Sequence, residues 1–109
     1  MAILATQTVA LGGLAPTYSA AAGGGDKVEC GDRNFIHVKN GAASPITVTL
    51  TSTALVRGQA AANVTVSVPA SGERMVGPLP ADLLLNASDG LCAVGYSSAT
   101  TVTVASLRI

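Results

Sequence analysis

The sequence predicts an all-β protein: a single antiparallel β-sandwich of about seven or eight strands, with jelly-roll or immunoglobulin-like topology. Three observations predict this fold. Apolar and polar residues alternate with a period of two along most of the chain, turn-forming segments recur at intervals of about 8–12 residues, and helical periodicity is almost absent. A chain of 109 residues has room for one domain with one core.

Each predicted strand follows from a stretch with this alternation. In residues 45–51, the apolar residues Ile46, Val48 and Leu50 face one side and the threonines face the other. β-Branched residues on both faces favour extended backbone. By the same criterion, strands are predicted at residues 3–11, 33–39, 45–51, 63–68, 73–76, 91–96 and 100–109.

The segments between these strands contain residues that favour turns. Residues 40–45 begin with Asn-Gly, which adopts the positive φ angles of tight turns, and we expect a hairpin loop there. Further turns are predicted at residues 69–72, 88–90 and 96–100. Residues 78–85 combine an early proline with three leucines, so we expect one helical turn that closes an end of the core.

The N-terminal segment differs from the rest in composition. Residues 1–25 carry no charged side chain and end in three glycines, so we expect an N-terminal strand or arm with a glycine-rich link. Residues 26–109 are then the β-sandwich domain. The Ala-rich stretch resembles a signal-peptide cleavage site, but no basic residue precedes it, so we expect the segment to be retained. Residues 26–33 mix both signs of charge and are expected to form a solvated loop.

Charge and aromatic content exclude several classes of function. Six basic and six acidic residues cancel, which excludes attachment to nucleic acid or to an anionic membrane through bulk charge. With no Trp, one Phe and two Tyr, a base-stacking platform is not expected. The outward faces of the predicted strands are rich in Thr and Ser and poor in charge, which indicates surfaces that are covered in use.

No group of residues predicts catalysis or a cofactor. The single histidine, His37, alternates with Ile36 and Val38, so we expect it to face solvent or an interface. No motif supplies a nucleophile and an orienting acid, and no metal-ligand spacing is present, so we expect neither an enzyme nor a metal or cofactor site. Cys30 and Cys92 form one disulfide in one interpretation and remain reduced in the other, with Cys92 as a small core residue.

Four stretches of the sequence resemble a known family. They are residues 25–27 (Gly-Asp-Lys), residues 31–41, residues 46–49 (Ile-Thr-Val-Thr) and residues 66–78. Together they resemble small structural proteins in the virions of tailed bacteriophages, chiefly phages of actinobacterial hosts. The resemblance implies a capsid decoration, or cement, protein. Such a protein, assembled in the host cytoplasm, would bind the lattice of the major capsid protein at the capsid surface and stabilise it.

Two alternatives stay open: a head-completion or tail structural protein of a phage, and a secreted β-sandwich binding module. For the decoration role we expect a homo-oligomer, such as a trimer, and no nucleic acid, membrane or small-molecule substrate as a partner. The residues expected at the partner interface lie in the N-terminal segment and in exposed turns: Ile3, Leu4, Thr6, Val9, Leu11, Tyr18, Arg57 and Arg74.

Overall fold

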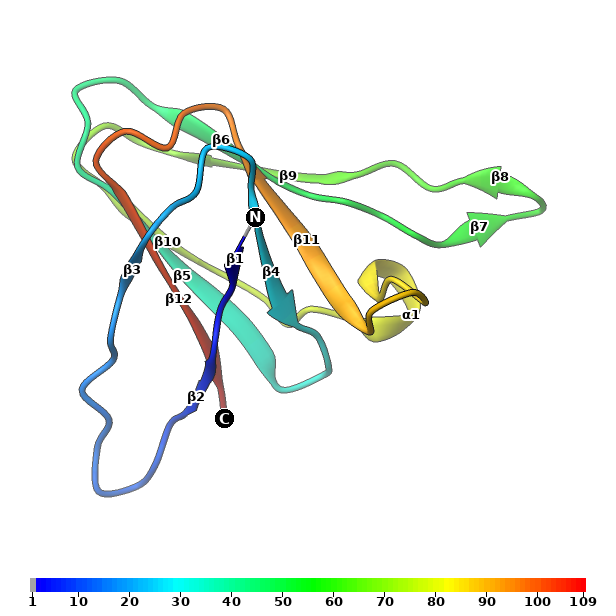
Figure 1. The fold of residues 1–109 in the computed structure, drawn as a ribbon, viewed down its shortest axis with the longest axis horizontal. Coiled ribbons are helices and arrows are strands. Elements are labelled where there is room, and N and C mark those ends of the chain that lie inside the picture. Colours follow the sequence, from blue (N-terminus) through cyan, green and yellow to red (C-terminus); the bar gives the residue numbers. More distant parts are fainter. Residues whose placement is uncertain (1) are drawn as a thin grey trace.

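A computed structural model describes residues 2–109, and most of their ordered backbone is β structure. Figure 1 shows two sheets, with a narrow hairpin projecting to one side. The strands in chain order are β1 (Ala2–Ile3), β2 (Thr6–Thr8), β3 (Ser19–Ala20), β4 (Asp26–Glu29), β5 (Asn34–Asn40), β6 (Ile46–Leu50), β7 (Leu55–Val56), β8 (Gln59–Ala60), β9 (Val64–Val68), β10 (Glu73–Val76), β11 (Leu91–Tyr96) and β12 (Val102–Arg108). One short helix, α1 (Ala81–Leu84), lies between β10 and β11 in this part of the chain.

The strands are divided between two larger sheets. Sheet A has the order β1-β4-β11-β6-β9, and sheet B has the order β10-β5-β12-β2, with β3 also paired to β12. Most neighbouring strands are antiparallel, but β1 pairs with β4 and β2 pairs with β12 in parallel. The predicted antiparallel pairing is therefore confirmed for most strands but not for β1 and β2, which pair in parallel at the edges of the two sheets. The described residues also form more strands than the seven or eight predicted, because several strands span only two residues.

Four antiparallel pairings are nested inside one another. The innermost pair is β6 with β9, and outside it follow β5 with β10, β4 with β11 and β3 with β12. Apart from the link between β6 and β9, each connection between successive strands of this set crosses from one sheet to the other. The chain from β3 to β12 is thus one long antiparallel ribbon that is folded over itself.

The two sheets bury a single hydrophobic cluster. Sheet A contributes side chains such as Val48, Leu50 and Val94, and sheet B contributes Ile36 and Val104. The period-two alternation predicts this arrangement, because every second side chain of these strands points to the same face. Branched aliphatic side chains fill the interior at high density without polar atoms that need partners.

A helical turn closes one end of the core, as predicted. Helix α1 follows Pro80, whose carbonyl oxygen accepts hydrogen bonds from the backbone N–H groups of Leu83 and Leu84. Leu79 and Leu84 are buried in the cluster between the sheets. The short helix is held by these buried leucines, since so few residues do not form a stable helix in water.

The N-terminal segment is attached to both sheets. The single strand predicted at residues 3–11 is wrong, because the chain passes from sheet A in β1 to sheet B in β2. Leu4 lies at this crossing and points into the core. The glycine-rich link ends in a packed glycine: Gly25 has φ +93°, and a Cβ atom there would lie 2.7 Å from the carbonyl oxygen of Val94. Only glycine fits that position without a shift of the backbone.

The loop predicted at residues 26–33 is in part a strand. Its first four residues form β4, in the interior of sheet A between β1 and β11. Asp26 is fully buried, and its Oδ2 accepts hydrogen bonds from the Tyr96 hydroxyl at 2.8 Å and from the Ala22 N–H at 3.3 Å. Burial, together with the hydrogen bond to Asp26, raises the pKa of Tyr96 well above its usual range. The carboxylate therefore ties β4, β11 and the end of the N-terminal segment together.

The hairpin loop predicted at residues 40–45 is also wrong, because β5 and β6 belong to different sheets. Asn40 organises this crossing from a buried position, with 2 % of its surface exposed. Its Nδ2 donates to the carbonyl oxygens of Ser44 at 2.9 Å and Pro69 at 3.2 Å, and its Oδ1 accepts from the Ala42 N–H at 2.9 Å. Since Pro69 begins the turn between β9 and β10, one side chain holds two crossings between the sheets together.

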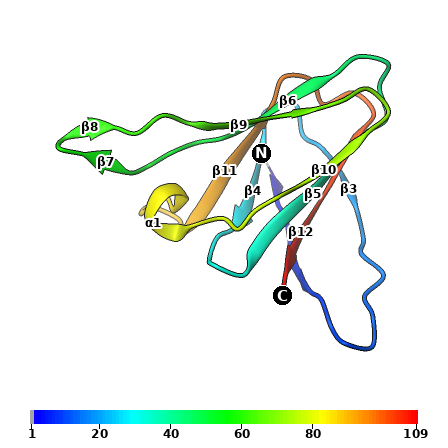
Figure 2. The same cartoon turned by 180° about the vertical axis from the view of Figure 1, so that it is seen from behind.

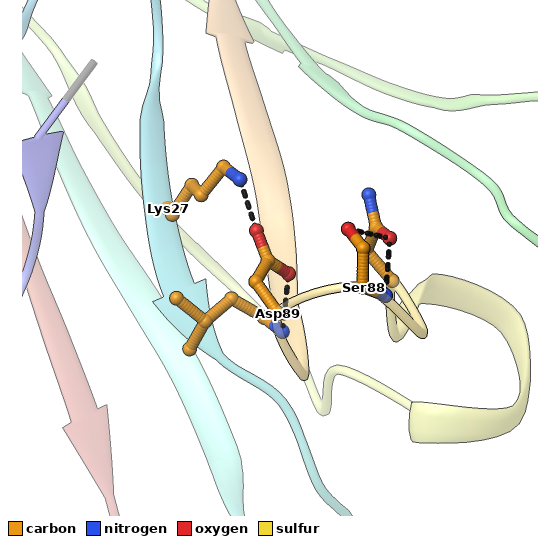
Figure 3. Close-up of polar contacts among 5 residues, drawn as sticks. Lys27, Ser88 and Asp89 are labelled. Carbon is orange, nitrogen blue, oxygen red and sulfur yellow. Dashed lines mark hydrogen bonds and ion pairs between the residues drawn. The ribbon is translucent and has the colours of Figure 1, made fainter.

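The turn predicted at residues 88–90 is confirmed, and Figure 3 shows how it is fixed. The side-chain oxygen of Asn86 accepts a hydrogen bond from the Ser88 N–H at 3.0 Å. Asp89 Oδ1 accepts from the Leu91 N–H at 3.0 Å, and Asp89 Oδ2 is paired with the Lys27 ammonium of β4. These contacts hold the start of β11 beside β4. They also keep the pKa of Asp89 below its usual value, chiefly through the bond from Lys27.

Candidate interaction surface

The N-terminal segment presents apolar side chains to solvent. Ile3 is largely exposed on β1, Leu11 is fully exposed in the loop after β2, and Val9 is about one third exposed. Leu4 differs, because it is buried in the core and its side chain is not free to meet a partner. Three of the apolar residues expected at an interface are therefore placed where a partner can reach them.

Polar contacts fix the base of this loop against sheet B. The Thr6 and Ser106 hydroxyl groups lie 3.2 Å apart and share a hydrogen bond between β2 and β12. The Gln7 side-chain amide makes two bonds of 2.8 Å to the backbone of Thr17, as donor to its carbonyl oxygen and as acceptor from its N–H. The two ends of the segment that carries Leu11 are thereby held together. The chain between Gln7 and Thr17 therefore forms a closed loop beside β2, the edge strand of sheet B.

Tyr18 anchors the same segment to the outer face of sheet B. Its hydroxyl oxygen lies 2.6 Å from His37 Nδ1, and the two rings meet edge to face with their centroids 5.5 Å apart. The Lys39 ammonium lies 4.1 Å from the centroid of the Tyr18 ring, within the range of a cation–π contact. On the neighbouring strand β10, Glu73 Oε1 lies 3.4 Å from His37 Nε2.

This cluster corrects the expectation for His37. The side chain does point away from Ile36 and Val38, as predicted, but it does not face solvent, because only 6 % of the residue is exposed beneath Tyr18. If the Tyr18 hydroxyl donates to Nδ1, the ring proton sits on Nε2 and faces Glu73. The residues lining the two described surface grooves do not include His37. The contact with Tyr18 anchors the N-terminal segment to β5.

Arg57 lies at the tip of a projecting hairpin. Strands β7 and β8 pair through Leu55 with Ala60 and Val56 with Gln59. The two turn residues, Arg57 and Gly58, have φ +52° and +81°. Positive φ at both turn positions matches the twist of a two-residue hairpin. Figures 1 and 2 show from opposite sides that this hairpin stands away from the two sheets.

Arg74 lies on β10, at the edge of sheet B. Its side chain is exposed, and Nη1 donates a 2.8 Å hydrogen bond to the carbonyl oxygen of Glu73. The expected interface residues therefore do not form one patch. Arg57 projects on the hairpin and Arg74 lies at one edge of sheet B. The N-terminal residues are themselves spread over β1 at the edge of sheet A, β2 at the opposite edge of sheet B, and the outer face of sheet B, where Tyr18 contacts His37.

Sequence reasoning missed an apolar groove at the end of sheet B. It has a volume of about 270 Å³ and is lined by Asp32, Arg33, Asn34, Phe35, Met75, Gly77, Pro78 and Ile109. Met75 is 66 % exposed and Ile109 is 68 % exposed. A Cβ atom at Gly77 would lie 2.4 Å from that of Phe35, so glycine lets the chain after β10 lie against β5. The available signal was Phe35, which shares the outward face of its strand with His37 and Lys39.

The two cysteines are free thiols. Cys92 is buried opposite Val28, and because β4 and β11 are antiparallel, Cys30 lies two positions further along, near Gly90. Burial raises the pKa of Cys92 to about 11, and burial likewise raises the pKa of Cys30. Both thiols are therefore protonated and poorly reactive at neutral pH. Of the two interpretations, the one with reduced cysteines matches this structure, and Cys92 is a small core residue.

Membrane-spanning helices and metal-ligand clusters are both missing from the described residues. No helix within residues 2–109 is long and apolar enough to span a membrane. Within the same range, no three His, Cys, Asp or Glu side chains lie close enough together to hold a metal ion.

Comparisons with protein-family models, with curated proteins and with solved structures find no match to this chain.

Proposed function

We propose that this chain is a structural protein of a bacteriophage virion that decorates the assembled capsid and stabilises it. The proposal begins from the resemblance of residues 25–27, 31–41, 46–49 and 66–78 to small virion proteins of tailed phages. It needs a stiff domain that lends contact surface to its neighbours, and it needs no catalytic centre.

The nested strand pairings support this proposal. An antiparallel ribbon folded into two sheets, with β3-β12-β5-β10 facing β4-β11-β6-β9, has the strand order of a jelly-roll sandwich. We infer that this eight-stranded unit is the body of the protein, and that β1, β2 and the β7–β8 hairpin are additions to it. Jelly rolls occur in viral capsid and lectin domains among others, so the fold alone does not select the function.

The observation that carries the proposal is where the apolar side chains are exposed. Leu11 lies on the loop at one edge of sheet B, Leu55 lies on the projecting hairpin, and Met75 and Ile109 lie at the groove. Single exposed apolar residues are common, but groups of them on projecting segments mark sites where proteins meet. Few charges interrupt these surfaces, since the whole chain has twelve charged residues, six of each sign.

A decoration protein can act through modest contacts. When two contacts reach adjacent capsid subunits, the second forms at a high effective concentration, so the combined binding exceeds either contact alone. Because such a protein binds the assembled lattice and not the separated subunits, it shifts the equilibrium toward the lattice.

Quantitative mass spectrometry of particles from cells that express the chain tests the proposal. The expected result is a copy number comparable to that of the major capsid protein. A much smaller number, restricted to the neck or tail, would identify a head-completion or tail component instead. Absence from the particles would exclude a virion role.

A variant pair tests the N-terminal contact. Leu11→Asp places a charge at the exposed tip of the loop, and we expect it to weaken binding to undecorated particles without lowering the melting temperature. Ala87→Asp is the matched control, because Ala87 is also exposed but lies in the turn before β11. Equal binding by the two variants would remove the loop from the interface.

A further inference from the structure

The β7–β8 hairpin projects from the two sheets, and only its base is held against the body of the described chain, where Thr53 donates hydrogen bonds to the carbonyl oxygens of Leu83 and Leu85. The hairpin extends outside both sheets, and none of residues 53–62 belongs to the described core cluster. Leu55 is 68 % exposed, and Arg57 is the only charged residue in this segment. An isolated two-stranded hairpin is marginally stable in water, so an apolar hairpin of this kind gains order when another surface covers it.

The groove at the end of sheet B has complementary properties. Its lining is mostly apolar, through residues such as Phe35, Met75 and Ile109, and it includes one acidic and one basic side chain, Asp32 and Arg33. Among the described residues, neither Asp32 nor Arg57 has an ion-pair partner. The volume of about 270 Å³ suits one or two aliphatic side chains rather than a large ligand.

We propose that the β7–β8 hairpin of one copy docks in the groove of a second copy, with Leu55 against the apolar lining and Arg57 beside Asp32. Leu55 and Arg57 are two positions apart at the end of the hairpin, so one hairpin end presents both side chains to the groove. Arg33 also lines the groove and carries the same charge as Arg57. The proposed contact therefore places Arg57 beside Asp32, which attracts it, and away from Arg33, which repels it.

The geometry requires two copies. Figures 1 and 2 both place the hairpin away from the C-terminal end of β12, which is next to the groove, so a chain does not fill its own groove. Hairpin and groove are different surfaces, so the contact is head-to-tail, and such contacts close into rings or continue as chains. This inference concerns the purified protein and does not depend on the virion role.

Sedimentation equilibrium of the full chain at low salt tests the contact between about 1 μM and about 1 mM, since a small interface gives weak association. The wild type should associate as concentration rises. Leu55→Asp and Arg57→Asp should each weaken association about tenfold or more, and Asp32→Arg should do the same. Arg57→Asp is compatible with the turn, because Asp tolerates positive φ.

The charge-exchanged double variant, Arg57→Asp with Asp32→Arg, makes the test specific. It should recover most of the association lost in the single variants, because the ion pair is restored with its signs reversed. Leu11→Asp is the control and should associate like the wild type. A protein that stays monomeric throughout, a double variant no better than the singles, or loss of association in Leu11→Asp would each overturn the proposal.

Discussion

Replacement of Asn40 by alanine tests the physical account of the fold most sharply. The side chain is buried, and its three shortest hydrogen bonds are two donor bonds of 2.9 and 3.2 Å and one acceptor bond of 2.9 Å. A hydrogen bond contributes about 1 kcal/mol net, so three bonds amount to about 3 kcal/mol. The carbonyl oxygens and the N–H group that lose their partner are in the two crossings between the sheets. We therefore expect Asn40→Ala to lower the free energy of unfolding by about 3 kcal/mol.

Urea denaturation followed by circular dichroism measures this loss, and a thermal melt should show a decrease of roughly 10–20 °C. The slope of the free energy against urea should stay unchanged if the fold is kept. Asn63→Ala is the matched control, because Asn63 is exposed and its Oδ1 accepts one bond, from the Ser52 N–H at 3.0 Å. A loss of less than about 1 kcal/mol in Asn40→Ala, equal to that of the control, would refute the role given to Asn40.

Three further predictions concern packing and ionisation. Gly25→Ala should destabilise the domain by about 2 kcal/mol or more in the same urea assay, because of the positive φ and the 2.7 Å approach to Val94; a neutral effect would contradict this packing. Cys92, whose pKa is raised to about 11 by burial, should resist a thiol reagent at pH 8 in the native protein and react after unfolding; rapid native labelling would contradict its burial. The native pKa of Asp89 is lowered, so its pairing with Lys27 should stabilise the fold above about pH 3.9 and lose this effect as the pH falls through the native pKa. Asp89→Asn should therefore be less stable than the wild type at pH 7 and equally stable at low pH, as measured by urea titrations; a constant difference would contradict the pairing.

The strands that were predicted from sequence are those with strict alternation. One face of β6 is buried through Ile46, Val48 and Leu50, and the other face carries threonines. Strict alternation of this kind is typical of a half-buried strand and does not fit a helix. The helical turn was predictable for a related reason. A proline favours the first turn of a helix, and the leucines that follow it can be buried at the end of the core. Local pattern and burial agree in both places.

Sheet membership was not predictable, because it depends on contacts between distant residues. The Asn-Gly pair at residues 40–41 is typical of a hairpin, yet the buried Asn40 side chain bonds across to Pro69 and turns the chain to the other sheet. In β4, the charged residues hide the alternation. Asp26 is buried there, and one of its hydrogen-bond donors is Tyr96, 70 positions further along the chain.

The candidate surface was predicted in part. Ile3 and Leu11, expected at a partner interface, are exposed, and their role there stays a prediction. The groove was missed because Phe35, Met75 and Ile109 come from three separate parts of the chain. The burial of His37 beneath Tyr18 was missed for the same reason, because this contact depends on how the loop between β2 and β3 packs against sheet B.

The central claim is that this protein functions by covering and joining neighbouring subunits of a shell. Electron cryomicroscopy of particles produced with and without the chain tests it most directly. The account predicts extra density at repeated positions on the outer surface of the capsid when the chain is present. Identical shells from both preparations, or extra density at the tail alone, would contradict it.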